Sequence, residues 1–215
     1  MRILVTNDDG IHAPGLDVAE TIARALSDDV WVVAPESEQS GASHSLTRAG
    51  PLRLRQVRER RYAVSGTPTD CVLMACLHLL KDLPPDLVLS GVNPGSNLAD
   101  DITYSGTVAG AMEGCALGIP AIALSQDPAG SRLEIDWSAG EAHGPAVIRQ
   151  LLAAGWPQGV LMNVNFPGIP AEQVCGVALV PQGHYDMLST EIIARTDMRE
   201  RPYYWIGLRH HETVP

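Results

Sequence analysis

The sequence has few of the features that mark secreted, membrane-spanning or metal-thiolate proteins. Its 215 residues include four cysteines, and no two of them form a C-x-x-C pair, so neither a zinc site nor a disulfide framework is expected. No apolar run approaches the roughly 18 residues of a transmembrane helix, and no basic segment followed by an apolar one opens the chain. These absences predict a soluble, cytoplasmic protein with no membrane partner.

Basic residues are also scarce. The chain has 15 Lys and Arg against 25 Asp and Glu, which gives a formal net charge of −10. Proteins that bind nucleic-acid polymers or anionic membranes present a basic surface, so both classes of partner are excluded. A small anion stays compatible, because a bound cation and backbone N–H groups can hold it locally. Hydrophobic residues make up 45% and charged residues 19%, as in an ordinary globular protein.

The first dozen residues carry the most informative pattern. Residues 3–6 are apolar and mostly β-branched, whereas residues 7–10 are turn formers, which predicts a buried strand ending in a loop. Asp8 and Asp9 lie in that loop. Two carboxylates held close together repel unless a cation lies between them, which favours a hard divalent ion such as Mg²⁺ or Mn²⁺. An ordinary solvated turn is an equally simple interpretation of these residues alone.

Strand and helix patterns alternate along the rest of the chain. Further buried strands are predicted at residues 30–34, 87–89, 119–125, 160–165 and 177–180, and helices at residues 16–27, from Pro68 onward, 105–114 and 139–153. This alternation predicts an α/β, Rossmann-like fold with a mostly parallel sheet and helices on both faces. The loops that follow the first strands then meet at one edge of the sheet, where ligands bind in open α/β folds.

Two segments depart from the alternation. Residues 45–65 are arginine-rich, with short alternating runs, and predict a β-hairpin arm whose arginines mostly face solvent. The tail contains Tyr203, Tyr204 and Trp205, which so irregular a segment cannot bury alone. We therefore expect a core over residues 1–180 and an extension over residues 181–215 that packs on the core or on another subunit.

Hard oxygen ligands follow three of the predicted strands. Asp8 and Asp9 come after the first, Ser40 and its neighbours after the second, and Asn93 after the third, a set that suits Mg²⁺ and leaves positions for water and substrate. Ser105 and Thr107 open a helix whose free N–H groups could hold a phosphate, although these residues alone favour a simple cap for Ser105. Together these features indicate phosphoryl transfer to water.

Several motifs in this order resemble the SurE (survival protein E) family of metal-dependent 5′/3′-nucleotidases. They are VTNDDGI at residues 5–11, VAP at 33–35 with QSGASHS at 39–45, GTPTDC at 66–71, SGVNPGSN at 90–97, YSGTVAGAMEG at 104–114 and YYW at 203–205. The resemblance implies a phosphomonoesterase that needs one divalent ion, Mg²⁺ or Mn²⁺. Its expected substrates are nucleoside 5′-monophosphates, with 3′-monophosphates and short polyphosphate as further candidates.

The resemblance also implies roles for individual residues. Asp8 and Asp9 would be catalytic. The metal ligands would be Asp8, Asp9, Ser40 and Asn93. The phosphate-binding residues would be Asn97, Ser105, Gly106 and Thr107. The family fold is a Rossmann-like core with a hairpin arm and a C-terminal segment exchanged between subunits, so a homodimer or homotetramer is expected. Family members usually continue past the YYW motif, which leaves open how the arm is completed.

The chemistry and two other classes of protein stay open at this point. Either water or one of the aspartates could attack phosphorus, and His44, or more weakly His12, could protonate the leaving oxygen. A signalling receiver domain also has paired acids after its first strand, but Gly91 occupies the position of its phosphoacceptor aspartate. A non-catalytic nucleotide-binding module is the other alternative, although no G-x-G-x-x-G follows the first strand.

Overall fold

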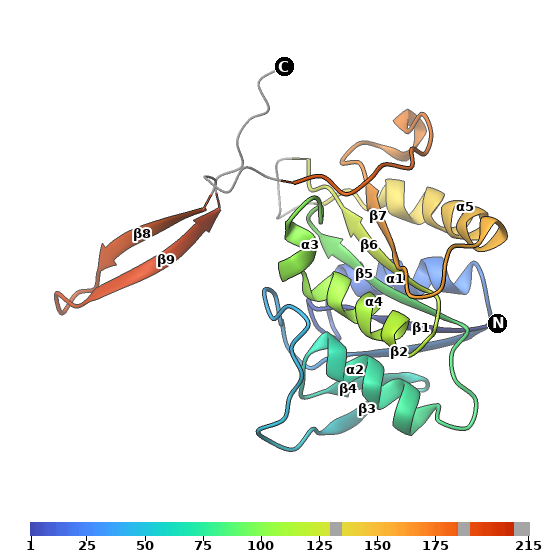
Figure 1. Cartoon of the computed structure of the whole chain (residues 1–215), viewed down its shortest axis with the longest axis horizontal. Coiled ribbons are helices and arrows are strands. Elements are labelled where there is room, and N and C mark those ends of the chain that lie inside the picture. The colour runs from blue at the N-terminus through green and yellow to red at the C-terminus, as the bar shows by residue number, and fades with distance from the viewer. Residues whose placement is uncertain (130–134, 185–189, 209–215) are drawn as a thin grey trace. The chain divides into compact units, whose positions relative to one another are not determined.

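A computed structural model of the chain describes residues 1–129, 135–184 and 190–208. The chain divides into two compact units, Met1–Leu179 and Val180–Pro215. The first contains a sheet covered by helices, and the second contains a two-stranded antiparallel ribbon (Figure 1). In the part of the chain that is described, no helix has the length and apolarity needed to cross a membrane.

The main sheet has seven strands in the order β3-β4-β2-β1-β5-β6-β7. Its strands are β1 (Arg2–Thr6), β2 (Asp29–Pro35), β3 (Leu54–Arg58), β4 (Arg61–Val64), β5 (Leu87–Pro94), β6 (Ala121–Gln126) and β7 (Met162–Phe166). Neighbouring strands are parallel except for the antiparallel pair of β3 and β4. The prediction of a mostly parallel sheet is confirmed, and the carboxyl ends of β2, β1 and β5 lie side by side.

Helices cover both faces of this sheet (Figure 1). They are α1 (Pro14–Arg24), α2 (Pro68–Met74), continued by the π-helical turn η1 (Ala75–Leu79), α3 (Asp101–Tyr104), α4 (Gly106–Ala116), α5 (Ser138–Ala154) and the 3₁₀ turn η2 (Ala171–Gln173). Helix α1 packs on β5 and against α5, whereas α4 packs on β5 and β6 and against α2. The two pairs of helices therefore form two separate outer layers.

Alternating side chains of β1 enter the two halves of the core. Ile3 and Val5 belong to the cluster that includes Leu16 of α1, and Leu4 belongs to the cluster that includes Val108 of α4. All three β1 side chains are completely buried, which explains why the strand is an unbroken apolar run rather than an alternating one. Asp8 and Asp9 lie in the loop that follows the end of this strand.

Two helix starts follow their sequence signals. Thr67 caps α2 by accepting a hydrogen bond from the Asp70 N–H, while the Asp70 carboxylate accepts one from the Thr67 N–H, and Pro68 takes the first helical position. Ser105 caps α4 by accepting a hydrogen bond from the Val108 N–H at 3.1 Å. The helix predicted from Pro68 onward and the cap considered for Ser105 are thus confirmed.

The strand predicted at residues 177–180 is wrong. Residues 174–180 have no regular secondary structure, and Val177, Leu179 and Val180 are 69%, 90% and 73% exposed. A strand requires a hydrogen-bonded neighbour, and in the described ranges β7 pairs only with β6. The short apolar run resembles a buried strand in composition alone.

The arginine-rich segment forms a hairpin, as predicted, but the hairpin extends the main sheet. β3 and β4 pair antiparallel, and β4 pairs parallel with β2. The second unit contains a separate hairpin of β8 (Thr190–Thr196) and β9 (Pro202–Leu208). In this hairpin Ile192, Tyr204, Trp205 and Ile206 are all at least 60% exposed.

Candidate active site

The loop after β1 is closed by its own residues and by the loop after β2. The Asn7 amide donates to the Gly10 carbonyl at 3.1 Å and accepts from the Gly10 N–H at 3.2 Å. The Gln39 N–H donates to the Asp8 carbonyl at 2.7 Å, and the Ile11 N–H donates to the Pro35 carbonyl at 2.8 Å. The backbone that carries Asp8 and Asp9 is therefore fixed from both sides.

Asp8 lies against the start of α4. The Thr107 hydroxyl donates to Asp8 Oδ1 at 2.5 Å, and Asp8 is only 4% exposed. A Cβ atom placed on Gly106 would lie 2.7 Å from Asp8 Oδ2, so only glycine allows this approach. The structure thus brings together three of the predicted site residues, Asp8, Gly106 and Thr107, with Ser105 as the adjoining cap.

Asp9 lies on the other side of the loop, where it lines a cavity of about 230 Å³ with residues of α1 and with Trp137. Its Oδ2 is buried and has no hydrogen-bond partner among the described residues. A buried carboxylate oxygen without a donor is costly. This oxygen therefore needs a partner that the described residues do not supply.

The negative charges of the two aspartates repel each other. Burial raises the pKa of Asp8, and the hydrogen bond from Thr107 offsets part of this rise. Burial, and then the charges of Asp8 and Glu38, raise the pKa of Asp9 to about 7. Neither carboxylate forms an ion pair with Lys, Arg or His in the described ranges. A divalent cation would supply both the missing charge and the missing partner of Asp9 Oδ2, so these residues fit a metal ion.

The two other predicted metal ligands are polar groups at the same edge of the sheet. Ser40 is exposed, and its hydroxyl donates to the Glu38 carboxylate at 2.9 Å. The Asn93 amide nitrogen donates to the Gly95 carbonyl at 2.6 Å. The described residues contain no group of three or more His, Cys, Asp or Glu that could hold a metal ion. Any ion bound here would therefore depend on hydroxyl, amide and water oxygens as well as on Asp8 and Asp9.

Asn97 is buried in a network of amides at the carboxyl ends of β6 and β7. Its side chain donates to the Ser125 hydroxyl at 2.8 Å. Its backbone N–H donates to Asn165 Oδ1, and its carbonyl accepts from the amides of Asn163 and Asn165. This network fixes the loop that precedes α3 and α4.

Gly91 argues against a receiver domain. Its φ of +139° lies in the region that favours glycine, and a Cβ atom there would lie 2.2 Å from the Leu124 carbonyl oxygen. A phosphoacceptor aspartate has no room at this position.

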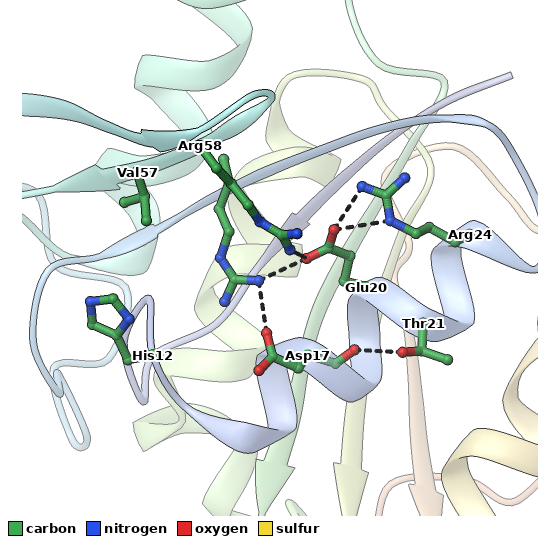
Figure 2. Close-up of a pocket in the computed structure, with 8 residues that line it drawn as sticks. His12, Asp17, Glu20, Thr21, Arg24, Val57 and Arg58 are labelled. Atoms are coloured by element: carbon green, nitrogen blue, oxygen red, sulfur yellow. Dashed lines mark hydrogen bonds and ion pairs between the residues drawn. The ribbon is translucent and has the colours of Figure 1, made fainter.

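The two histidines considered as proton donors have different surroundings. The His44 ring is hydrogen-bonded to the Glu113 carboxylate of α4, with its Nε2 2.8 Å from Oε2. His12 instead lines a cavity of about 580 Å³ together with residues of α1 and of the β3–β4 hairpin (Figure 2). His44 is thus tied to the helix that carries the Thr107 hydroxyl.

The sequence patterns did not indicate the role of Arg61, which is 6% exposed. Its guanidinium donates to the Ile11 carbonyl at 2.6 Å, to Asp17 at 2.7 Å and to Glu20 at 2.8 Å. Glu20 also accepts from Arg24 and Arg58, so charged groups line this cavity (Figure 2). The arginines that do remain on an exposed face, as expected, are Arg48, Arg53, Arg55 and Arg58. The sequence does show two acids, Asp17 and Glu20, three positions apart on α1. Only the three-dimensional structure shows that Arg61 is their partner.

The comparisons with known proteins agree in pointing to one family. The family model of survival protein SurE matches residues 3–188. The 5′-nucleotidase SurE of Methylorubrum populi is 62% identical over 208 residues, which cover 96% of this chain and 82% of that protein. The 5′-nucleotidase SurE of Azorhizobium caulinodans is 60% identical over 219 residues, which cover 100% of this chain and 86% of that protein.

A solved structure gives the same result. The crystal structure of the SurE protein from Aquifex aeolicus matches with a TM-score of 0.84 and 38% identity, covering 99% of this chain and 86% of that chain. The α/β fold with its mostly parallel sheet is thus shared with a protein of this name. On the match of the family model and the identity to these relatives, the chain belongs to the SurE family.

Proposed function

We propose that the chain is a metal-dependent 5′-nucleotidase that hydrolyses nucleoside 5′-monophosphates to nucleoside and phosphate. The observation that carries this proposal is the pair of carboxylates beside the start of α4, the buried Asp8 and the half-buried Asp9, whose Oδ2 atom is buried. The relatives named 5′-nucleotidase SurE, at 57–62% identity over nearly the whole chain, support it. SurE nucleotidases depend on a metal ion, which agrees with the unbalanced charge of the two carboxylates.

Asp8 and Asp9, together with Asn93 and Ser40, are the residues that would hold one divalent ion, Mg²⁺ or Mn²⁺. Such an ion supplies positive charge against the phosphate and lowers the pKa of water, so that hydroxide is available near neutral pH. The amide nitrogen of Asn93 is used by the Gly95 carbonyl, which leaves its amide oxygen for the ion. The Ser40 hydroxyl is held by Glu38 and would have to turn away from that carboxylate to bind the ion.

The phosphate would lie at the start of α4. The first-turn N–H groups of an α-helix have no partner inside the helix, and Ser105 satisfies only that of Val108. That of Gly106 would donate to a phosphate oxygen, and the absence of a side chain at Gly106 keeps the approach open, whereas the Thr107 N–H is shared with the Asp8 carboxylate. Asn97 uses one amide N–H on Ser125 and has a second N–H for the phosphate. These donors stabilise charge that develops on phosphorus-bound oxygen.

The test is phosphate release from a panel of 5′- and 3′-nucleoside monophosphates and short polyphosphate. The wild type is compared with Asp8→Asn and with the control Asp82→Asn, which removes the same charge from an exposed residue near the amino end of β5. We expect release that EDTA abolishes, that Mg²⁺ or Mn²⁺ restores, and that Asp8→Asn lowers about a hundredfold or more. Release that survives both EDTA and Asp8→Asn would contradict the proposal.

We further propose that the β8–β9 hairpin pairs with a second copy of this chain in a homodimer or homotetramer. A lone two-stranded ribbon is marginally stable in water, and this one exposes Ile192, Tyr204, Trp205 and Ile206. Light scattering on the purified protein gives the test. The proposal predicts an oligomer that Trp205→Ser with Ile206→Asp dissociates, and a wild type that is monomeric at micromolar concentration would contradict it.

A further inference from the structure

The cavity beside Asp9 has a distinct chemical character. Apart from Asp9, its walls are apolar side chains and one glycine, namely Ala13, Pro14, Gly15, Pro94, Ile135 and Trp137. They come from the start of α1, from the last residue of β5 and from the residues just before α5. Pro94 directly follows the proposed metal ligand Asn93. The cavity therefore shares one wall with the catalytic carboxylates and is otherwise suited to an apolar group.

Its position relative to the phosphate donors follows from the contacts of the two aspartates in the loop after β1. Asp8 faces α4, where Gly106 and Thr107 contact it. Asp9 faces the other layer of helices, where the cavity lies. A phosphate ester that reacts at the two carboxylates therefore has anion donors on one side and an apolar cavity on the other.

The other cavities fit an apolar ring less well. The one lined by Asp17, Glu20, Arg58 and Arg61 is charged (Figure 2). A cavity of about 310 Å³ over the ends of β2 and β4 is lined mainly by polar groups, among them Glu36, Ser37, Gln39, Thr47, Ser65 and Thr67. A third, which contains Trp156, lies where β6 and β7 begin, at the opposite edge of the sheet.

Trp137 presents a fixed aromatic surface to the cavity. A Cβ atom on Gly15 would lie 3.2 Å from Trp137 Cη2 and 1.9 Å from the Val92 carbonyl oxygen, so the indole packs directly on the backbone at the start of α1. The indole is half-buried against the core. No hydrogen bond of its Nε1–H is found within the described residues, although buried indoles usually find an acceptor. The ring is thus positioned by its neighbours and retains a donor.

We propose that this cavity is the nucleobase subsite, in which the base of the substrate stacks on Trp137. This inference rests on the proposed nucleotidase function, and it places the base of the nucleotide in the cavity that Asp9 lines. Stacking on an aromatic ring tolerates every base, because each base has a π-face. The subsite therefore selects nucleotides over phosphate esters without a ring, and it discriminates little between purines and pyrimidines.

The experiment compares Trp137→Ala and Trp137→Phe with the control Trp156→Ala, which truncates a half-buried tryptophan at the opposite edge of the sheet. Steady-state kinetics with Mn²⁺ use 5′-AMP, 5′-CMP and β-glycerophosphate, an ester that has no ring. Trp137→Ala is expected to raise KM about tenfold or more for both nucleotides and to leave KM for β-glycerophosphate unchanged. Trp137→Phe should retain most of the affinity, and Trp156→Ala should change neither KM.

A second readout does not depend on turnover or on a metal ion. Adenosine should quench the tryptophan fluorescence of the EDTA-treated wild type, and this change should be absent in Trp137→Phe. Melting curves show whether each variant is folded, and where Trp137→Ala does not fold, the comparison of wild type with Trp137→Phe by fluorescence decides.

The outcomes separate this inference from the proposed function. Equal losses for nucleotides and β-glycerophosphate, or no change in either, would overturn the subsite while leaving the nucleotidase intact. Quenching by adenosine that persists in Trp137→Phe would do the same. Failure of the wild type to release phosphate from any of the three esters would instead overturn the proposed function.

Discussion

Replacing Arg61 by methionine tests how the loop that carries Asp8 and Asp9 is held in place. The guanidinium connects β4 to the Ile11 carbonyl, three residues after Asp8, and to Asp17 and Glu20 of α1. Methionine replaces the aliphatic part of the side chain and removes every donor. The variant therefore reports on the hydrogen bonds and the ion pairs with little change in packing.

The magnitude follows from the partners that remain. Removing one member of a buried ion pair costs about 3–5 kcal/mol when the other charge is left alone. Glu20, however, keeps Arg24 and Arg58, and the Asp17 side chain is 65% exposed, so its pair with Arg61 contributes at most about 1 kcal/mol. The Ile11 carbonyl loses its buried donor, which costs about 1–3 kcal/mol. We expect a total loss of about 2–3 kcal/mol, or about 4–12 °C in Tm.

Arg58→Met is the matched control. Arg58 also donates to Glu20, but its side chain is 56% exposed, so its loss should cost less than about 1 kcal/mol. Urea unfolding gives the free energies, and the Mn²⁺ concentration that half-saturates phosphate release reports on the loop. Arg61→Met should raise that concentration and Arg58→Met should not. Equal changes in the two variants, in stability and in Mn²⁺ dependence, would refute this reasoning.

Three further predictions concern the two aspartates and their neighbours. Asp9→Asn should raise the Tm of the protein in EDTA, because burial and then the neighbouring charge of Asp8, which raise the pKa of Asp9 to about 7, disfavour a carboxylate but not an uncharged amide; calorimetry that shows a lower Tm would contradict this. Because this pKa is raised from 3.8 in the unfolded chain, the contribution of Asp9 to the free energy of unfolding is fully present below about pH 4 and is lost as pH rises through 7. The Tm difference between the wild type and Asp9→Asn should therefore widen from pH 5 to pH 8, and Mg²⁺ should narrow it; a difference independent of pH would be the contrary result. Gly106→Ala places a Cβ 2.7 Å from the Asp8 side chain and should lower kcat/KM about a hundredfold, whereas Gly176→Ala, where a Cβ meets nothing, should leave it unchanged.

The sheet was predictable where its residues carry local signals. The apolar run of β1 passes directly into the turn at Asn7–Gly10, and Thr67 and Ser105 stand at helix starts with the hydroxyls that a cap requires. These signals depend on a few neighbouring residues, so the sequence alone contains them. The run at residues 177–180 carries the same local signal as a strand, yet it has no strand beside it. Whether such a run pairs depends on the rest of the sheet.

The candidate site was predictable in part, for a related reason. Asp8, Gly106 and Thr107 were named from motifs, and the contact between them depends on α4 starting directly above the end of β1. The roles of Ser40, Asn93 and Asn97 at a metal ion or a phosphate stay predictions.

The burial of Arg61 could not be predicted from the sequence, because its partners lie 41 to 50 positions away. The cavity beside Asp9 likewise required three separate segments to be placed in space. Both features depend on contacts between distant parts of the chain, which no local pattern specifies.

Whether Asp8 and Asp9 together hold a catalytic divalent ion can be tested directly by anomalous diffraction from crystals soaked in Mn²⁺. We expect one strong Mn²⁺ peak in contact with carboxylate oxygens of both aspartates and near the Asn93 side chain, and no such peak in Asp9→Asn. A Mn²⁺ ion bound elsewhere in the wild type, with none at these two carboxylates, would contradict it.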